Sequence, residues 1–476
     1  MKEGVLVVDV GTSKVHTNII DTENGEILLS KIEPFKWSHP KEGWSEADVN
    51  QEWEATQKAV GSIVEESKGK INLNAVALST IGGGLLFMDQ HGDPVGNMIL
   101  PMDGRAKKEG QEIYEAFEQK NSGPKGMAGN MPGAKVLWFK RNRPEDFKRV
   151  AIIGHIQQFF TWKLGFGPVT DRGLATGFYN SETGQWNTEL CDFLGFSTDK
   201  LGKLPVSADT FLGVTKNFGS VNFDKEIPVV LGTYDVGAGL LGLGCLPGSD
   251  AVLGDVTGTW EQIGCLVSDK EAVKKMSPLM MCGPIENSFI VLGAQVSGPN
   301  LDWFIHTFFP DEGLAAINRL FDLYPLDGMN KVFMTKDINS GDGTIRGLSL
   351  TSTVGDIFKG IIEGLTFPWV STVKNFETVN GRKFGALRVG GGSAKSDKWS
   401  QLKADIFDIR VEKVRNIEIT SLGTAIIAAV GIGKYPDYQT AMKQMIGIEK
   451  TYEPNHLLTE RYQERYQEFL EKQRQG

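Results

Sequence analysis

The stretch Val5–Ser13 reads VLVVDVGTS and decides how the chain is interpreted. Its apolar residues are mostly β-branched, and a Gly-Thr pair then ends the apolar run. This pattern predicts a buried strand that leads into a turn. Two more strand-like stretches, 16–21 and 26–35, follow at hairpin spacing, with Asn24-Gly25 as the turn between them. The chain therefore opens with a strand, a Gly/Thr turn and an antiparallel hairpin.

A similar arrangement begins again near residue 250. Residues 250–264 read DAVLGDVTGTWEQIG, which predicts a strand, a Gly/Thr turn and a second strand. DVGTS at 9–13 and DVTGTW at 255–260 both follow an apolar strand. Strands alternate with helical stretches elsewhere, including a helix predicted over 354–370. The pattern favours an α/β fold whose two halves begin alike, although Gly-Thr turns are common enough for so short a repeat to arise by chance.

Length and composition limit the class of protein. The 476 residues exceed what one hydrophobic core usually supports, so we predict two domains, residues 1–245 and 246–476. The net charge of −9 argues against a nucleic-acid or anionic-membrane partner. The four cysteines show no CxxC spacing, the N-terminus has no signal-peptide layout, and no apolar run approaches about 18 residues. We therefore expect a cytoplasmic globular protein.

Three glycine-rich turns could hold an anion. Glycine and threonine after a strand expose backbone N–H groups and hydroxyls that can converge on phosphate oxygens. The third turn, VGGGSAKSDKW at 389–399, lies between a strand and a helix. None matches the P-loop or the dinucleotide-binding GxGxxG, and each taken alone is equally an ordinary tight turn. Trp260, Trp303 and Trp399 fall at core spacing, which predicts packing rather than stacking on a ligand.

Asp235 is the single carboxylate of the stretch GTYDVGAGLLGLG, residues 232–244, which has no basic residue. A carboxylate in apolar surroundings is costly unless something compensates for its charge. One interpretation is an aspartate that caps the helix beginning there. The other is a general base, because a carboxylate within hydrogen-bond reach of an alcohol can accept its proton as a new bond forms.

Together these segments resemble the FGGY family of carbohydrate kinases, which belongs to the actin-like ATPase superfamily. The resemblance runs in the family's order from about Val5 to Gly433, and its segments are DVGTS (9–13), GWSEADVNQEW (43–53), PMDGRA (101–106), MPGAKVLWFKRN (131–142), GTYDVGAG (232–239), VTGTWEQIG (256–264), GTIRGLSLTSTVGDIFKGIIE (343–363), GGGSAKSDKWSQLKAD (390–405) and ITSLGTA (419–425). It implies an α/β fold of two actin-like (ribonuclease H-like) domains with a cleft between them.

The resemblance also implies an activity, the ATP-dependent transfer of a γ-phosphate to a hydroxyl of a small ketose or polyol, with Asp235 as the general base. Mg²⁺ would be held by Asp9 and Asp235, since this ion prefers carboxylate oxygens and retains waters. The residues that the resemblance places around ATP are Gly11, Thr12, Ser13, Lys14, Gly258, Thr259, Gly298, Asp302, Gly391, Gly392, Ser393 and Ser396. Those that it places around the sugar are Gly82, Gly83, Asp103, Arg105 and Asp235.

Two regions depart from the family's pattern. His16 stands where relatives carry Arg or Lys, and Lys14 is the basic residue nearby. The loop Ile81–Gly84 lacks the Arg-Glu pair of glycerol kinases and the Met-His pair of xylulose kinases, so it offers backbone and space but no charged anchor. Glycerol is therefore not expected, and xylulose lacks its own fingerprint. The second turn resembles that of fuculose and rhamnulose kinases, and the range expected is a xylulose-, fuculose-, ribulose- or erythritol-like substrate.

Two other functions stay open at this point. One is a relative that binds sugar and nucleotide without transferring phosphate. The other is an actin-like chaperone-type ATPase, against which Asp103, Arg105 and the late glycine-rich segment argue. The sequence fixes neither the sugar nor the oligomeric state, for which a homodimer is one expectation. Four polar residues, His155, Gln157, Gln158 and Asp171, lie in the segment that lines the sugar site in relatives, but any single one of them is more often a structural residue with satisfied hydrogen bonds.

Overall fold

The computed structural model describes residues 1–117, 129–248, 252–257, 260–276, 281–312, 315–336 and 343–474. It divides into two compact units. Unit 1 comprises Met1–Gly242, Leu266–Ile290 and Ile419–Ile446, and unit 2 comprises Leu243–Cys265, Val291–Glu418 and Gly447–Gly476. The domain boundary expected after residue 245 stays a prediction. None of the helices in the described ranges has the length and apolar composition needed to cross a membrane.

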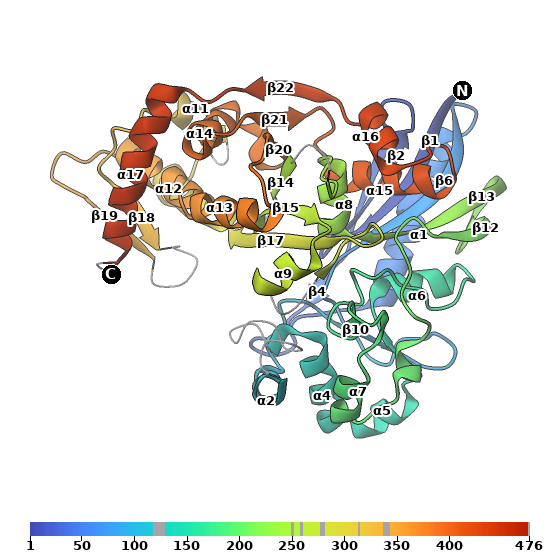
Figure 1. Cartoon of the computed structure of the whole chain (residues 1–476). Helices are drawn as coiled ribbons and strands as arrows, with labels where there is room; N and C mark the ends of the chain where they lie inside the picture. The colour runs from blue at the N-terminus through green and yellow to red at the C-terminus, as the bar shows by residue number, and fades with distance from the viewer. Residues whose placement is uncertain are drawn as a thin grey trace. The chain divides into compact units, whose positions relative to one another are not determined.

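Unit 1 is built on a six-stranded mixed sheet (Figure 1). Its strands, in spatial order, are β12 (Phe211–Phe218), β13 (Val221–Tyr234), β6 (Ile71–Thr80), β1 (Lys2–Val10), β2 (Lys14–Asp21) and β3 (Ile27–Pro34). The strands β13, β6 and β1 run parallel to one another, and the outer strands pair antiparallel. The strand, turn and hairpin predicted from the first 35 residues are confirmed.

The central strand β1 is buried on both faces. Leu6, Val8 and Val10 belong to one apolar cluster with residues of helix α1 (Val49–Ser67), whereas Val5 and Val7 point to the opposite face, because side chains alternate along a strand. Helix α15 (Ile419–Gly431) contacts β1 and β6 and packs against α8 (Asp235–Gly242). Strands covered by helices on both faces read as continuous apolar runs, which explains the composition of β1.

The register of the parallel strands places three loops at one edge of this sheet. Val10 pairs with Thr80, and Thr80 pairs with Tyr234, so β1, β6 and β13 end side by side. The turn Gly11–Ser13, the loop Ile81–Gly84 and Asp235 follow these three ends. Segments far apart in the sequence therefore lie at the same end of the sheet.

The remaining elements of unit 1 are short strands and peripheral helices. They are β4 (Trp37–Ser38), β5 (Glu46–Ala47), β7 (Leu86–Met88), β8 (Met98–Ile99), α2 (Lys107–Phe117), α4 (Pro132–Asn142), α5 (Pro144–Arg149), β9 (Ile152–Gly154), α6 (Ile156–Lys163), β10 (Tyr179–Asn180), β11 (Gln185–Trp186), α7 (Thr188–Leu194), η2 (Thr198–Leu201), α9 (Lys270–Met276), β16 (Met281–Cys282) and α16 (Tyr438–Met445).

The second sheet, most of which lies in unit 2, repeats the pairing seen around β1. Strand β14 (Val252–Thr257) pairs antiparallel with β15 (Trp260–Val267) and parallel with β20 (Ala386–Gly391), as β1 pairs with β2 and β6. The other strands of this sheet are β16, β17 (Phe289–Val296), β21 (Val411–Val414) and β22 (Ile448–Tyr452), and a separate hairpin joins β18 (Phe333–Lys336) to β19 (Thr344–Arg346).

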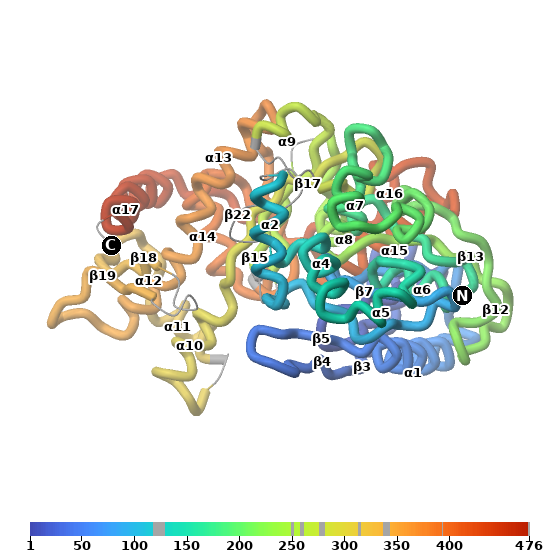
Figure 2. The backbone as a smooth tube through the Cα atoms, turned by 90° about the horizontal axis from the view of Figure 1, so that it is seen from below, coloured from blue at the N-terminus to red at the C-terminus, as the bar shows by residue number. Residues whose placement is uncertain are grey.

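Six helices and one short 3₁₀ helix complete the described part of unit 2. They are α10 (Gly298–Phe308), α11 (Ala315–Leu323), α12 (Val354–Thr366), α13 (Pro368–Asn380), η4 (Ser393–Lys395), α14 (Asp397–Phe407) and α17 (His456–Arg474). Figure 2 shows α12 and α17 beside the β18–β19 hairpin, and these two helices share one apolar cluster with β18, α10 and α14. The single helix predicted over 354–370 is wrong, because Phe367 ends α12 and Pro368 opens a new helix, the position that proline favours.

Candidate active site

Asp235 begins helix α8 directly after β13, at the edge where the three parallel strands end. Its Oδ1 accepts a hydrogen bond from the N–H of Val236 at 2.8 Å, and its carboxylate also accepts one from the N–H of Gly82. Burial raises the pKa of Asp235 to about 6, against the effect of these backbone donors. The carboxylate is therefore ionised at neutral pH and binds a proton more strongly than an ordinary aspartate does.

The loop Ile81–Gly84 is held by side chains from other elements. Lys135 on α4 donates from Nζ to the carbonyls of Leu100 (2.8 Å) and Gly83 (3.4 Å), and the Nδ1 of His155 lies 2.7 Å from the carbonyl oxygen of Gly84. Both side chains are buried, and burial lowers the pKa of Lys135 to about 7 and that of His155 to about 4. The loop is thus held in place through its backbone carbonyls.

Asp103 and Arg105, predicted to line the sugar site, are bonded to each other. The Nε and Nη2 of Arg105 donate to the two carboxylate oxygens of Asp103 at 2.8 and 2.7 Å, and Nη1 lies 2.8 Å from Glu46. The guanidinium also packs on the ring of Trp44, 3.9 Å from its centroid, and on that of Trp138 at 5.0 Å. The positive charge of Arg105 and the negative charge of Asp103 are therefore compensated by each other and by Glu46, within unit 1.

The first Gly/Thr turn is the tight connection between β1 and β2. The N–H of Gly11 donates to the carbonyl of Lys14 at 3.1 Å, Thr12 is half-buried, and Ser13 and Lys14 are exposed. His16 is buried in the sheet with its Nε2 2.8 Å from the hydroxyl of Ser30. Lys14 is therefore the exposed basic residue of this turn. Asp9 is half-buried, one residue before the end of β1.

Asp171 and Gln157 lie beneath the end of β13 and support it. The hydroxyl of Thr233 donates to Asp171 at 2.8 Å, and the N–H of Asp171 donates to the side chain of Gln157 at 2.9 Å. Gln157 in turn donates to the carbonyl of Gly232 at 3.2 Å. Burial raises the pKa of Asp171 to about 6. These residues, considered for the sugar site, have the fully bonded surroundings of structural groups.

In unit 2 the glycine-rich segment after β20 lies against the end of β14. The N–H of Gly392 donates to the carbonyl of Thr257 at 2.8 Å. Gly391 has a φ of +77°, and a Cβ atom on it would lie 2.3 Å from the Thr257 carbonyl oxygen. Only glycine fits there. Of the other residues predicted for ATP, Gly258 and Thr259 lie outside the described residues, as does the side chain of Ser393.

Three more residues predicted for the nucleotide lie on or directly before helices of unit 2. Ser396 caps α14 by accepting from the N–H of Trp399 at 3.3 Å, and Gly298 is the first residue of α10. Asp302 is exposed on α10, and its carbonyl lies 2.7 Å from the Nδ1 of His306. These positions remain predictions for nucleotide contact.

A buried ion cluster between β14, β15 and α14 was not predicted. Lys403 on α14 bonds to Asp255 on β14 and, at 2.7 Å, to Glu261 on β15. Glu261 also accepts from Ser297 at 2.8 Å and from Trp369 at 3.0 Å. The ammonium lowers the pKa of Glu261, whereas burial dominates at Asp255 and raises its pKa. No sequence signal marked this cluster, because α14 reads DKWSQLKADIF and Lys403 is one of several charged residues in it.

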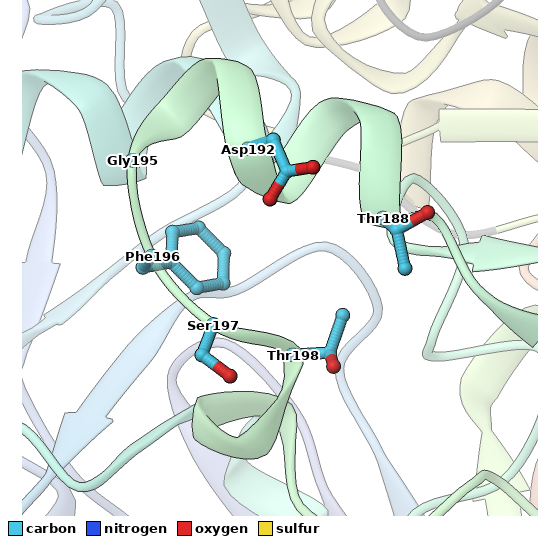
Figure 3. A pocket seen from close by; sticks show the side chains of 6 residues that line it. All are labelled: Thr188, Asp192, Gly195, Phe196, Ser197 and Thr198. Atoms are coloured by element: carbon cyan, nitrogen blue, oxygen red, sulfur yellow. The ribbon is translucent and has the colours of Figure 1, made fainter.

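A pocket of about 510 Å³ lies elsewhere in unit 1 (Figure 3). It is lined by Thr188, Asp192, Gly195, Phe196, Ser197 and Thr198, from α7, η2 and their connection. None of the residues predicted for the sugar or for ATP lines it. Among the described residues, no group of three or more His, Cys, Asp or Glu side chains could hold a metal ion, and the four cysteines are buried and unpaired.

Two sheets of the same pairing pattern, with glycine-rich segments at the ends of β1 and β20, define the class of the fold as α/β. The N-terminal domain of the FGGY family of carbohydrate kinases matches residues 4–242, and the C-terminal domain of that family matches residues 256–432. The chain belongs to the FGGY family of carbohydrate kinases. It is accordingly an ATP-dependent kinase with an alcohol group as acceptor.

Individual relatives match over nearly their whole length. A xylulose kinase of Staphylococcus epidermidis is 26% identical, over 100% of this chain and 98% of the relative. An L-xylulose/3-keto-L-gulonate kinase of Escherichia coli is 25% identical over 98% and 95%. The crystal structure of a gluconate kinase from Lactobacillus acidophilus superposes with a TM-score of 0.85 at 22% identity, over 99% of this chain and 97% of that one. The predicted fold class of two actin-like units is confirmed.

Proposed function

We propose that this kinase transfers the γ-phosphoryl group of ATP to a hydroxyl of a neutral open-chain ketose or polyol, with Asp235 as the general base. The observation that carries the proposal is the position of Asp235, which stands beside Gly82 at the edge where three parallel strands end. A pKa of about 6 suits a base that works near neutral pH, because it is ionised there and still holds a proton well.

The proposed transfer accounts for every bond and for the proton that moves. The acceptor hydroxyl gives its proton to Asp235 as its oxygen bonds to the γ-phosphorus, and the bond from that phosphorus to the β,γ-bridging oxygen breaks. ADP leaves, and Asp235 later releases the proton to water. The backbone donors Val236 and Gly82 hold the carboxylate in one orientation during this exchange.

Asp9 and Asp235 fit the requirements of a Mg²⁺ ion. When bound, Mg²⁺ would offset charge on the phosphate oxygens, and it favours one or two carboxylates with several waters retained. Asp9 and Thr233 both pair with Ser79, so Asp9 on β1 and Asp235, two residues after Thr233, belong to strands two positions apart and lie at the same end of the sheet. Either carboxylate would hold the ion directly or through a retained water.

The preference for a neutral acceptor follows from the cations near the predicted sugar residues. A sugar acid needs a cation that is not already compensated. Arg105 is paired with both Asp103 and Glu46, and the ammonium of Lys135 is bonded to backbone carbonyls. Neither guanidinium nor ammonium is left for a substrate carboxylate. Ketopentoses are the first candidates, since relatives are named xylulose kinases, and the deoxy-ketoses and tetritols expected from the sequence follow.

Sugar-dependent ADP release tests the proposal. Purified chain with Mg²⁺ and ATP is offered D-xylulose, L-xylulose, D-ribulose, L-fuculose and erythritol, with gluconate and glycerol as controls. We expect at least one neutral sugar to stimulate ADP release far above the rate without sugar. Nucleotide binding with no turnover of any sugar would instead favour the non-catalytic relative. A homodimer, a cytoplasmic location and the absence of nucleic-acid or membrane partners remain predictions from the sequence.

A further inference from the structure

Tyr234 is the last residue of β13 and directly precedes Asp235. Its side chain is 4% exposed, and its hydroxyl has no hydrogen-bond partner in the described part of the chain. Burial of an unpaired hydroxyl is unfavourable, and phenylalanine would bury the same ring without that penalty. The packing around the ring indicates what the side chain does.

Three glycines surround this ring. A Cβ atom on Gly82 would lie 3.1 Å from Cδ2 of Tyr234, one on Gly237 would lie 3.2 Å from Cε1, and one on Gly173 only 2.5 Å from Cε1. Contacts this short force a neighbour to move. The ring therefore occupies the space that side chains at these three positions would need.

The neighbours of the ring cannot easily yield. The loop that carries Gly82 is held through the carbonyls of Gly83 and Gly84 by Lys135 and His155, and its N–H at Gly82 is bonded to Asp235. On the other side, Asp171 accepts from the N–H of Gly173 at 2.9 Å and fixes that turn. The ring is thus wedged between two fixed backbone segments, next to the proposed base.

We propose that Tyr234 is a positioning residue of the sugar site, whose buried ring packs against the loop Ile81–Gly84 and, by fixing the position of that loop, sets the width open to the acceptor beside Asp235. The inference rests on the proposed function. It assigns the shape of the acceptor site to the ring and leaves nucleotide binding to other residues. Sugars that differ in bulk near the reacting hydroxyl should therefore be discriminated by the size of residue 234.

The test uses a graded series at this position. Tyr234→Phe keeps the ring, Tyr234→Leu shortens it and Tyr234→Ala removes it. We expect Tyr234→Phe to hold the KM for the best sugar within about threefold and to keep the ranking of sugars. Tyr234→Leu and Tyr234→Ala should raise that KM at least tenfold. They should also reduce the difference in KM between slim and bulky sugars, while the KM for ATP stays within twofold of the parent value.

A double substitution tests the steric contact itself. Gly82→Ala should impair sugar use in the parent chain but much less in Tyr234→Ala, because the added methyl then has space. Gly61→Ala on α1 is the matched control, since a Cβ there meets only an ordinary 3.4 Å contact. Thermal unfolding verifies that each variant is folded, and Tyr234→Leu remains informative if Tyr234→Ala does not fold.

The outcomes separate the two proposals. A parent chain that releases no ADP with any sugar overturns the proposed function, and this inference with it. A parent chain that is active, with folded Leu and Ala variants that keep both the sugar KM and the ranking, overturns only the role of Tyr234. Additive effects of Gly82→Ala and Tyr234→Ala would contradict the steric explanation.

Discussion

Replacing Asp235 with asparagine separates the chemistry of this carboxylate from its place in the fold. Asparagine has nearly the same shape and keeps an oxygen that can accept from the N–H groups of Val236 and Gly82. It removes the negative charge and the ability to take a proton. The substitution should therefore leave the strand end intact while it abolishes general-base catalysis.

The expected loss of rate is about 10²- to 10⁴-fold in kcat, the range that a positioned base contributes, or about 3–5 kcal/mol of transition-state stabilisation. The KM for ATP should stay within about twofold, since the nucleotide is predicted to contact other residues. A base acting in the ionised form also makes kcat/KM fall about tenfold per pH unit below its pKa, which lies at about 6 for Asp235.

Asp235→Asn should also raise the free energy of unfolding. Burial raises the pKa of Asp235 from 3.8 to about 6, so the folded chain binds this proton more tightly than the unfolded chain does. Ionised Asp235 therefore destabilises the fold above pH 6, by up to about 3 kcal/mol from a shift of about two pKa units. Asp235→Asn should gain up to that amount at pH 8, and the gain should disappear as the pH falls below about 4.

The assay measures ADP release and denaturant unfolding for the parent chain, for Asp235→Asn and for Asp224→Asn. Asp224 is an exposed aspartate on the same strand, so its variant should match the parent in both measurements. An unchanged kcat in Asp235→Asn would remove this residue from the mechanism. A variant less stable than the parent at pH 8 would refute the reasoning about burial, because it would show that the charge is compensated in the fold.

Three further substitutions test the supports of the site. Lys135→Met should raise the sugar KM about tenfold with little change for ATP, because the ammonium fixes the loop at Gly83; equal effects on both substrates would contradict this. Gly391→Ala should lower the free energy of unfolding, measured with denaturant, by about 2–4 kcal/mol. Gly381 also has a positive φ but open space around it, so Gly381→Ala should lower the free energy of unfolding by about 1 kcal/mol. Lys403→Met should cost about 3–5 kcal/mol, against less than about 1 for Lys450→Met in an exposed pair; similar losses in both would refute the buried cluster.

The strands and the main turns could be predicted from the sequence because their signals are local. The apolar run before Gly11 and the capped helix α1, with Asp48 at its N-cap, are complete within about 20 residues. The order of the strands is not local, since Val10 of β1 pairs with Thr80 of β6, 70 positions away, and Thr80 pairs with Tyr234 of β13, 154 positions away. The FGGY resemblance supplied this arrangement, and spacing alone did not.

Side-chain surroundings were harder to predict. Trp303 was expected in the core, and that prediction is wrong because it is 38% exposed on α10, whereas Trp399 is 5% exposed as predicted. The side chain of Trp260 lies outside the described residues. Lys135 and Lys403 are buried against the usual preference of lysine, and only the folded structure shows the carbonyls and carboxylates that make this favourable. The motif in PMDGRA singled out Asp103 and Arg105, but it did not predict that the two side chains pair with each other.

The most direct test is to trace the γ-phosphoryl group by ³¹P NMR in a reaction that contains Mg²⁺, ATP and the best sugar of the panel. We predict a new phosphomonoester signal that grows in equal amount with ADP in the parent chain and is absent over the same time in Asp235→Asn. ADP accompanied only by orthophosphate, or an ester formed equally fast by the variant, would contradict a sugar alcohol deprotonated by Asp235.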